Sequence, residues 1–315
     1  TGGSSVLRYT LKRLAVGILT LAALATITFF LMKIIPGSPF GGELAQLSPE
    51  VREMLYAQYN LDKSIPEQFL IYLQNAITGD FGDSMTRKGT AVTTIIARCL
   101  PATMKLGLVA FIIAITVGVT LGIVAAFTKR KWVENLVMFV TTIGISVPSF
   151  LYAMLLMIVF GVILGWLPII GLKTPLHYIM PAFSLALYPI SMITRLVRSS
   201  MKEVMKQDYI VLARSKGTPM IKVTLGHALK NCLIPVVTYA GPLLAFLITG
   251  SFVIESLFSI PGIGSEFVNS VTNRDYTMIM ALTILFGSFI IIVNILTDLL
   301  VAFIDPRVKL EKKAS

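Results

Sequence analysis

The chain alternates between long apolar runs and shorter polar segments. Six runs carry almost no charge, and each exceeds the roughly 20 residues that an α-helix needs to cross about 30 Å of hydrocarbon. They occupy residues 14–35, 106–127, 136–164, 176–197, 233–254 and 278–304. These runs are apolar on every side, whereas a membrane β-barrel needs alternating segments of about 10 residues. The pattern therefore predicts an all-α membrane protein with six spanning helices.

The first run follows Arg8, Lys12 and Arg13, an arrangement that also occurs in signal peptides. It is longer than the roughly 7–15 residues of a signal-peptide core, and no Ala-x-Ala site follows it. We therefore expect a spanning helix, with Lys33 at its far end reaching the interface. Residues 1–5 carry no structural pattern, and we expect them to be an engineered scar.

The polar segments suggest how the chain is organised. We expect a cytoplasmic tail and first helix over residues 6–35, and an external segment over 36–98 with turn and helix-start signals. A membrane-embedded core over residues 99–305 would contain a long basic cytoplasmic loop at 198–230. Residues 306–315 would form a second cytoplasmic tail.

The charges support this topology. With six spans both termini lie on one side of the membrane, and that side receives 18 of the 27 lysine and arginine residues. An excess of basic residues marks the cytoplasmic side. The net charge of +11 is thus an orientation signal, with its largest share in the loop at 198–230. We expect no nucleic-acid partner.

Composition narrows the possible chemistry. Hydrophobic residues make up 55% of the chain and charged residues 14%, too few charges to cover a soluble domain of this size. The two cysteines, Cys99 and Cys232, lack metal-ligand spacing, and we expect two unrelated small apolar residues without a metal site. The sequence contains no GxxxxGK[ST] phosphate loop, so ATP would have to be bound by another chain.

Several polar residues and helix breakers fall within the predicted spans. Prolines and glycines in three consecutive spans are compatible with a translocation path, and equally with tight packing of small residues. The candidates for the path are Ser146, Pro148, Ser184, Tyr188, Asn294 and Asp298. Ser146 with His177 faintly resembles an intramembrane serine protease, but Val147 replaces the second glycine of that motif. A bent helix at Pro148 is the simpler interpretation, and we expect no catalytic residue.

The basic loop contains a short amphipathic helix, predicted over residues 205–216. Tyr209, Leu212 and Ala213 form an apolar edge at i, i+3 and i+4, with Asp208, Arg214 and Lys216 beside it. Gly217, followed by Thr218 and Pro219, favours a stop after this helix. Such a helix lies on anionic lipid or docks into a groove of a cytoplasmic partner, and the Asp at its start favours docking.

At this loop the sequence resembles a known family. The segments DYIVLARSKG (208–217) and HALKNCLIPV (227–236) are similar to the coupling loop of binding-protein-dependent ABC importer permeases, and most similar to their peptide branch. Further matching segments are YNLDK (59–63), GDFGDS (79–84), GISVPSF (144–150), ESLFSIPGIG (255–264) and RDY (274–276). Val211 and Leu212 stand where the general importer pattern has Glu and Ala, so a salt bridge from that Glu is not expected here.

The resemblance implies a type-1, MetI-like permease fold with both termini cytoplasmic, in a bacterial cell membrane. It implies a homologous second permease subunit, two cytoplasmic ATPase subunits that bind ATP and Mg, and an external or periplasmic peptide-binding protein. In that model Asp208, Tyr209, Leu212, Ala213, Arg214, Lys216 and Gly217 couple the chain to the ATPases. The expected contacts with the binding protein are Asp80, Asp83, Glu266, Arg274 and Asp275.

The cargo and the driving force leave alternatives. A proton-coupled peptide symporter would use several carboxylates within the spans, and this sequence offers Asp298 alone. Related permeases carry nickel chelates, glutathione or opines, so the resemblance leaves the cargo open. The implied function is import of peptides through a path of which this chain forms half.

Overall fold

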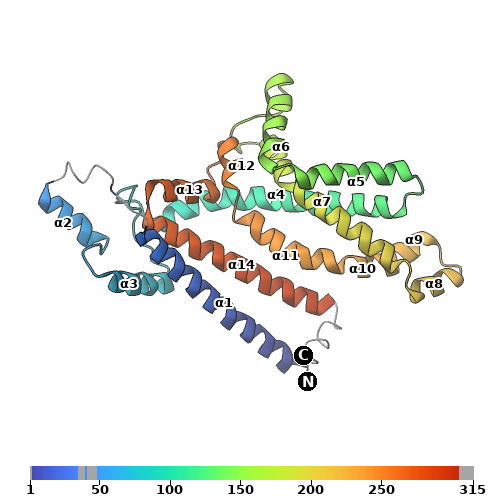
Figure 1. Ribbon diagram of the computed structural model, residues 1–315, viewed down its shortest axis with the longest axis horizontal. Helices are drawn as coiled ribbons and strands as arrows, with labels where there is room; N and C mark the ends of the chain where they lie inside the picture. Colours follow the sequence, from blue (N-terminus) through green and yellow to red (C-terminus); the bar gives the residue numbers. More distant parts are fainter. Residues whose placement is uncertain (1, 35–39, 41–47, 305–315) are drawn as a thin grey trace. The chain divides into compact units, whose positions relative to one another are not determined.

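A computed structural model describes residues 2–34, 40 and 48–304, without the side chains of 2–8, 214, 220, 221, 225, 227, 303 and 304. Every regular element in that part of the chain is a helix (Figure 1). Extended pairing within it is limited to one isolated bridge between Asp83 and Ala91. The predicted all-α class is confirmed.

The chain divides into two compact units. The first unit contains residues 1–103 and 261–291, and the second contains residues 104–260 and 292–315. The first comprises α1 (Gly2–Ile34), α2 (Pro49–Gln58), α3 (Ile65–Thr78), α13 (Ile263–Asn273) and the first parts of α4 (Val92–Phe127) and α14 (Tyr276–Ile304).

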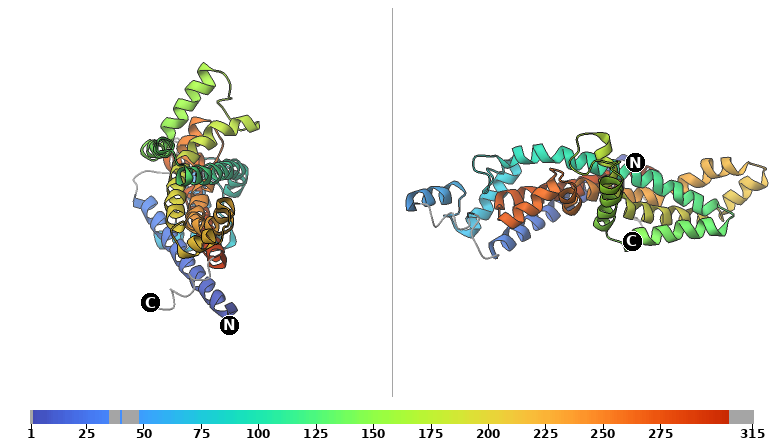
Figure 2. Two further views of the ribbon diagram at one scale, coloured as in Figure 1. Left: turned by 90° about the vertical axis from the view of Figure 1, so that its right-hand side faces the viewer. Right: turned by 90° about the horizontal axis from the view of Figure 1, so that it is seen from above.

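Glycines allow α1 to lie closely along α14 in the first unit (Figures 1 and 2). A Cβ on Gly17 would lie 2.6 Å from the side chain of Ile291, and a Cβ on Gly287 would lie 2.7 Å from that of Leu21. Small residues let membrane helices approach each other and gain van der Waals contact, since burial from lipid supplies little driving force. The close contact therefore depends on these two positions.

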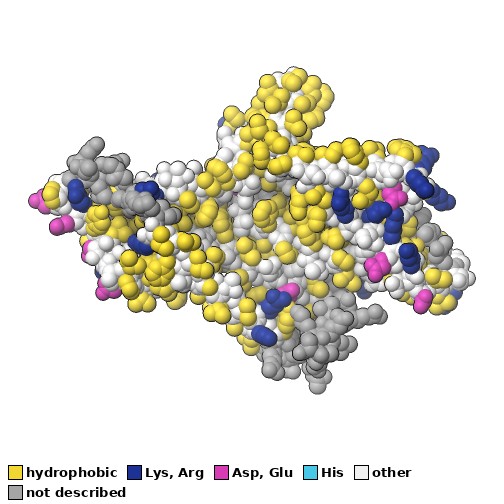
Figure 3. All heavy atoms as spheres, in the orientation of Figure 1, with side chains coloured by type: hydrophobic (Ala, Val, Ile, Leu, Met, Phe, Trp, Pro, Cys, Tyr) yellow, Lys and Arg dark blue, Asp and Glu magenta, His cyan; other side chains and the backbone are white. Residues whose placement is uncertain are grey.

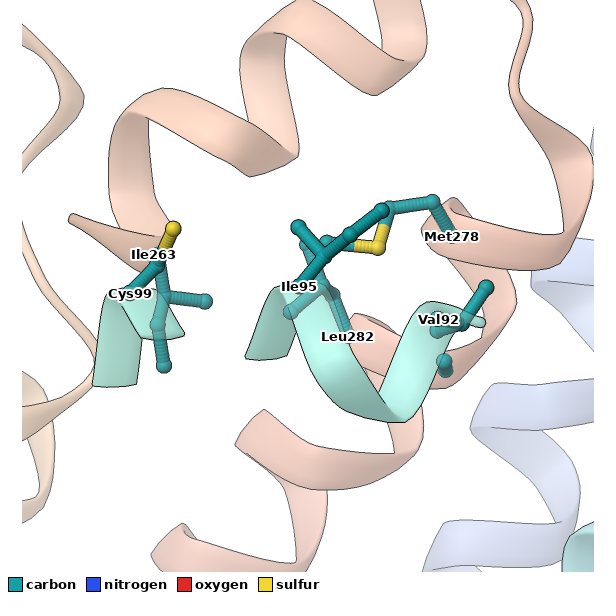
Figure 4. Packing of buried hydrophobic residues seen from close by; sticks show 7 residues of the cluster. Val92, Ile95, Cys99, Ile263, Met278 and Leu282 are labelled. Carbon is teal, nitrogen blue, oxygen red and sulfur yellow. The ribbon is translucent and has the colours of Figure 1, made fainter. Parts of the chain in front are cut away.

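The core of the first unit lies where α4 begins. Val92, Ile95 and Cys99 project from one face of α4 at helical spacing. They pack against side chains of α13 and α14 (Figure 4), namely Ile263, Met278, Ala281 and Leu282. Cys99 is buried and unoxidised here, and Cys232 is buried and unoxidised in the second unit. The interpretation of both cysteines as small apolar residues is confirmed.

The short helices of the first unit begin and end at the residues that the sequence marks. Ser48 caps α2, where its hydroxyl accepts a hydrogen bond from the amide of Val51. Ser64 and Glu67 form a capping box at the start of α3. Gly79 ends α3 in the left-handed conformation, with φ +75°. The glycine stop at the end of α3 leads the chain directly into the turn at residues 80–85.

The second unit is built around α7. Besides the remainders of α4 and α14 it contains α5 (Lys131–Ser146), α6 (Ser149–Leu156), η2 (Met157–Ile163), η3 (Pro175–Tyr178), α7 (Ile179–Val204), α8 (Asp208–Ser215), α9 (Met220–Val223), η4 (Thr224–Ala228), α10 (Leu229–Cys232), α11 (Ile234–Ile248) and α12 (Phe252–Leu257). Gly144 of α5 lies directly against Ser191 of α7, and Gly118 and Gly122 of α4 lie against Ile193 and Val197. These contacts hold α7 between α4 and α5.

Five helices in the described residues are long and apolar enough to cross a membrane. The count becomes six if the bent pair formed by Lys131–Ser146 and Ser149–Ile163 is one span. That pair bends by 105°, which confirms the bent helix expected at Pro148 (Figure 1). Proline disfavours the α-conformation of the residue before it, and Val147 before Pro148 is extended. The hydroxyl of Tyr152 bridges the bend by donating to the carbonyl of Ile143 at 2.5 Å.

Other boundaries differ from the sequence prediction. The second spanning helix begins at Val92 and includes Pro101, because helix continues into a segment predicted to be external. The fifth ends at Ile248, since Gly250 takes φ +89° before α12 starts. The helix of the basic loop is shorter than predicted, because residues 205–207 form the turn that ends α7.

Candidate functional site

The predicted docking helix exists as α8, in the second unit. Asp208 lies in its first turn, where a negative charge complements the helix dipole. At its other end Gly217 adopts φ +77°, and the amide of Thr218 donates to the carbonyl of Ala213 at 3.3 Å. This Schellman ending favours glycine, because a Cβ strains the left-handed conformation. The predicted stop at Gly217 is confirmed.

The faces of α8 differ in exposure. Ile210 is completely buried, whereas Tyr209, Val211 and Leu212 expose 41%, 52% and 56% of their surface. Sequence periodicity identified Tyr209 and Leu212 but missed both the inward anchor Ile210 and the outward Val211. A short helix held by one buried residue, with three apolar side chains exposed, is suited to a groove in a partner.

A hydrogen bond to α10 holds α8 in place, and the remaining predicted coupling residues differ in exposure. The amide nitrogen of Asn231 donates to the hydroxyl of Tyr209 at 2.7 Å, which joins α8 to α10. Ala213 is half-buried, and Lys216 is exposed. The side chain of Arg214 lies outside the described part of the structure.

A cluster of charges fastens α7 to α5 beside this helix. Glu134 on α5 accepts hydrogen bonds from Arg198 and Lys202 on α7, and its Oε1 lies 2.9 Å from Nε of Arg198. Arg195 reaches the same helix through the hydroxyl of Thr142 at 2.7 Å. Figure 3 shows basic side chains gathered over the ends of α5 and α7. Sequence reasoning assigned Arg195, Arg198 and Lys202 to the basic side of the membrane. It could not show that Glu134 pairs with Arg198 and Lys202.

The six residues proposed for a translocation path lie in different environments of the second unit. Ser146 and Pro148 are exposed at the break between α5 and α6. Ser184 is completely buried, and its hydroxyl donates to the carbonyl of Met180 at 2.8 Å. Tyr188, one turn later, exposes 47% of its surface. Ser184 therefore bonds within its own helix, whereas Tyr188 is exposed at the surface of α7.

The remaining two candidates lie on α14. Asn294 has a side-chain oxygen that is buried and lacks a hydrogen-bond partner among the described residues. Asp298 is half-buried one turn later. An unsatisfied buried carbonyl usually costs about 1–3 kcal/mol, so Asn294 marks a place where a donor from outside this chain would add stability.

An apolar pocket of about 610 Å³ lies among α4, α11 and α14 in the second unit. Gly241 and Thr297 form part of its wall and touch each other, since a Cβ on Gly241 would overlap the Thr297 hydroxyl. Most of its other lining residues are aliphatic, and none of the six path candidates belongs to it. The polar candidates and this apolar pocket are therefore separate features.

A buried carboxylate organises the corner of the first unit where residues 83–86 meet the start of α14. Asp275 is 2% exposed, and its carboxylate accepts five hydrogen bonds. The donors are the hydroxyls of Ser84, Thr86 and Thr277 and the backbone amides of Met85 and Met278. Asp275 was predicted to contact a binding protein; its enclosure by its own chain does not fit that role.

The other external candidates remain accessible. Glu266 pairs with Arg87 through contacts of 2.8 and 2.9 Å, and this hydrogen bond raises the pKa of Arg87. Arg274 ends α13 in the left-handed conformation and is half-buried. Asp80 is exposed, with its carboxylate accepting from the amide of Gly82, and Asp83 is half-buried.

Comparisons with known proteins connect these features. A family model described as "Binding-protein-dependent transport system inner membrane component" matches residues 118–310. The chain is 41% identical to oligopeptide transport system permease protein OppB of Haemophilus influenzae, covering 96% of this chain and 100% of that protein. It is 41% identical to dipeptide transport system permease protein DppB of Bacillus subtilis, covering 97% and 99%.

A solved structure extends the comparison to the fold. Inward-facing MetNI, a methionine ABC transporter, has a chain that matches with a TM-score of 0.57 and 17% identity. The match covers 68% of this chain and 97% of that one. At this identity the likeness concerns the fold alone, and the MetI-like architecture implied by the sequence is confirmed.

Proposed function

Because the chain belongs to the family of binding-protein-dependent transport system inner membrane components, we propose that it is a permease subunit of an ATP-driven peptide importer. The observation that carries this proposal is identity of about 41% to two peptide-transport permeases over nearly the whole chain. The chain is a multi-helix component of a bacterial inner membrane. It forms half of a translocation path and is no enzyme.

The partners follow from the same relationship. A homologous second permease completes the path, two cytoplasmic ATPase subunits bind ATP and Mg, and an external binding protein delivers the peptide. In this chain α8 seats in a groove of one ATPase, with Tyr209, Val211 and Leu212 as its apolar contacts. Ala213 lies at the edge of that contact, and Asp208, Arg214 and Lys216 orient it. The Gly217 turn lets the chain leave the groove sharply.

Movement of α8 reaches the spanning helices through α7. When ATP binding draws the two ATPases together, α8 moves with one of them and carries the end of α7. The ion pairs of Glu134 with Arg198 and Lys202 make α5 follow α7. A rigid-body motion of packed helices against the second permease then opens the path to one side at a time. Exposed Tyr188 and Ser146, with Asn294 and Asp298, supply polar groups toward that path.

The topology follows the charges. Both termini and α8 lie in the cytoplasm, and the bent pair α5 and α6 crosses the membrane once. Asp80, Asp83, Glu266 and Arg274 then belong to the external surface that receives the binding protein. A peptide is the cargo because the relatives that match along their whole length are oligopeptide and dipeptide permeases.

Affinity purification of the full chain from native membranes tests the assembly. We expect one second permease and two ATPase subunits to co-purify with it in stable proportion, and mass spectrometry identifies them. Retention of the ATPases should not depend on added peptide, since α8 is exposed in the chain by itself. Recovery of this chain without ATPases from membranes that contain the neighbouring subunits would contradict the proposal.

A further inference from the structure

A pocket of about 370 Å³, lined by both polar and apolar side chains, lies entirely within the first unit. Its walls come from the last turn of α1, the connection between α2 and α3, α3 itself, the turn at residues 80–85 and the start of α14. The volume falls in the range of roughly 300–1,000 Å³ that is usual for small-molecule sites. The established family relationship assigns no role to this pocket.

The pocket contains a half-buried cation, Lys33. Its ammonium lies 2.5 Å from the amide oxygen of Gln68 and 5.5 Å from the ring centres of both Phe29 and Tyr276. Among the described residues no carboxylate pairs with it within 4 Å. An ammonium carries three donors, so the Gln68 contact leaves capacity for an incoming acceptor.

A half-buried ammonium between two aromatic rings is incompletely compensated. Loss of hydration disfavours a charge, and neutral partners recover only part of that loss. Sequence reasoning expected Lys33 to reach the interface, and in the structure its ammonium bonds to Gln68 of α3 and lines the pocket. A ligand carboxylate entering the pocket would form a charge-assisted hydrogen bond with this ammonium.

The pocket wall also provides the opposite charge. Asp80 and Asp83 line it, together with the hydroxyl-bearing rings of Tyr59 and Tyr72 and the amide of Asn75. Burial raises the pKa of both tyrosines, and the negative charges of Asp83 and Asp275 raise that of Tyr59 further. Both phenols therefore stay neutral hydrogen-bonding groups at physiological pH, and Asp83 acts on the electrostatics of the pocket.

We propose that this pocket binds a short zwitterionic peptide, with the ligand carboxylate paired to Lys33 and the ligand ammonium near Asp80 and Asp83. The aromatic walls accommodate an apolar side chain between the two charged ends. The preference of the pocket for a carboxylate follows from Lys33. That the ligand is a peptide rests on the proposed function of the chain. The permease would thus hold peptide on its external side independently of the binding protein.

Binding by the full chain in lipid nanodiscs tests the proposal, with alanyl-phenylalanine as the probe and calorimetry as the measurement. We expect the dipeptide to bind about tenfold or more tightly than its C-terminal amide, which lacks the negative charge that would pair with the Lys33 ammonium. N-acetylation should also weaken binding, because it removes the ammonium. Equal affinity for the dipeptide and its amide would overturn the proposal, and this comparison needs no variant.

Variants locate the site. Lys33→Met should remove the preference for the free carboxylate, and Lys33→Arg should keep it. Lys63 is an exposed lysine outside the pocket, so Lys63→Met should leave the affinity for the dipeptide unchanged. Asp80→Asn keeps an acceptor for the Gly82 amide but should weaken binding of the free amine. An unaltered preference in Lys33→Met would contradict the site. A second outcome would also contradict the site: Lys33→Met binds dipeptide normally but loses affinity for the binding protein. In that case Lys33 would pair with a carboxylate of the binding protein and not with one of the peptide.

These results separate the pocket from the importer. Binding to the isolated chain requires neither ATP nor partners. Absence of dipeptide binding, with ATP-driven transport intact, would remove the pocket proposal alone. Binding with the expected selectivity, without ATP-driven transport in the complete complex, would remove the proposed function alone.

Discussion

Leu212→Asp should abolish ATPase association while the chain still folds and inserts. Leu212 is 56% exposed on α8, so the substitution leaves the interior of the chain unchanged. In the complex it would place a carboxylate in an apolar groove. Central apolar contacts typically contribute about 2 kcal/mol or more, which corresponds to roughly thirtyfold in affinity. Co-purification of ATPase with the variant chain, and thermal unfolding of the chain alone, measure the two effects.

Gln207→Asp is the matched control. Gln207 is exposed immediately before α8, and the substitution introduces the same charge outside the apolar face. It should leave ATPase binding within a few-fold of the native value. Normal ATPase recovery with Leu212→Asp would show that α8 is not the docking element. Equal loss with both variants would show that charge, rather than the apolar face, governs association.

Asp275→Ala should destabilise the corner of the first unit where residues 83–86 meet α14 more than the substitution of an exposed acid in the same unit does. It removes the acceptor of five hydrogen bonds and leaves the buried amides of Met85 and Met278 without their partner. Each unsatisfied buried donor costs about 1–3 kcal/mol, so we expect a loss of about 3–5 kcal/mol. A lower unfolding temperature and faster proteolysis within residues 79–92 are the measurements.

Asp62→Ala provides the comparison for this effect. Asp62 is an exposed carboxylate between α2 and α3, and its removal should change the unfolding temperature little. Asp275→Asn should fall between the two, since an amide keeps one acceptor oxygen. Similar unfolding temperatures for Asp275→Ala and Asp62→Ala would contradict the organising role of Asp275.

Features with a local cause could be predicted from the sequence. Apolar length predicts the spanning helices, because backbone groups in hydrocarbon must be satisfied within the segment. The capping signals at Ser48 and Ser64 and the glycine stop at Gly217 act over a few residues, and the structure has each of them. The break at Pro148 is also local, although its angle of 105° depends on what surrounds it.

Features that depend on distant partners could not be predicted. Asp275 and Ser84 are separated by 191 residues, and nothing near either one indicates that they meet. Glu134 similarly pairs with residues 64 and 68 positions away. Sequence reasoning placed Asp275 on a contact surface because the resemblance implied a binding-protein interface there, and the mixed charge of that turn suits a reversible polar contact. A buried carboxylate with five donors is the exception that only tertiary structure shows.

Sequence spacing also cannot predict which face of a short helix is buried. Spacing of i, i+3 and i+4 identified Tyr209, Leu212 and Ala213, but in an eight-residue helix two different faces satisfy that spacing. Which face turns inward depends on the elements that pack around α8, α9 among them, and the inward residue is Ile210. The exposed Val211 consequently joins the proposed docking surface.

Peptide uptake by the reconstituted complex tests the central claim most directly. The chain is placed in liposomes with its second permease and the ATPases, with ATP inside and binding protein and labelled dipeptide outside. We expect uptake only when both ATP and binding protein are present, and no dependence on a pH gradient. Uptake driven by a pH gradient through this chain alone, without ATPase subunits, would contradict the account.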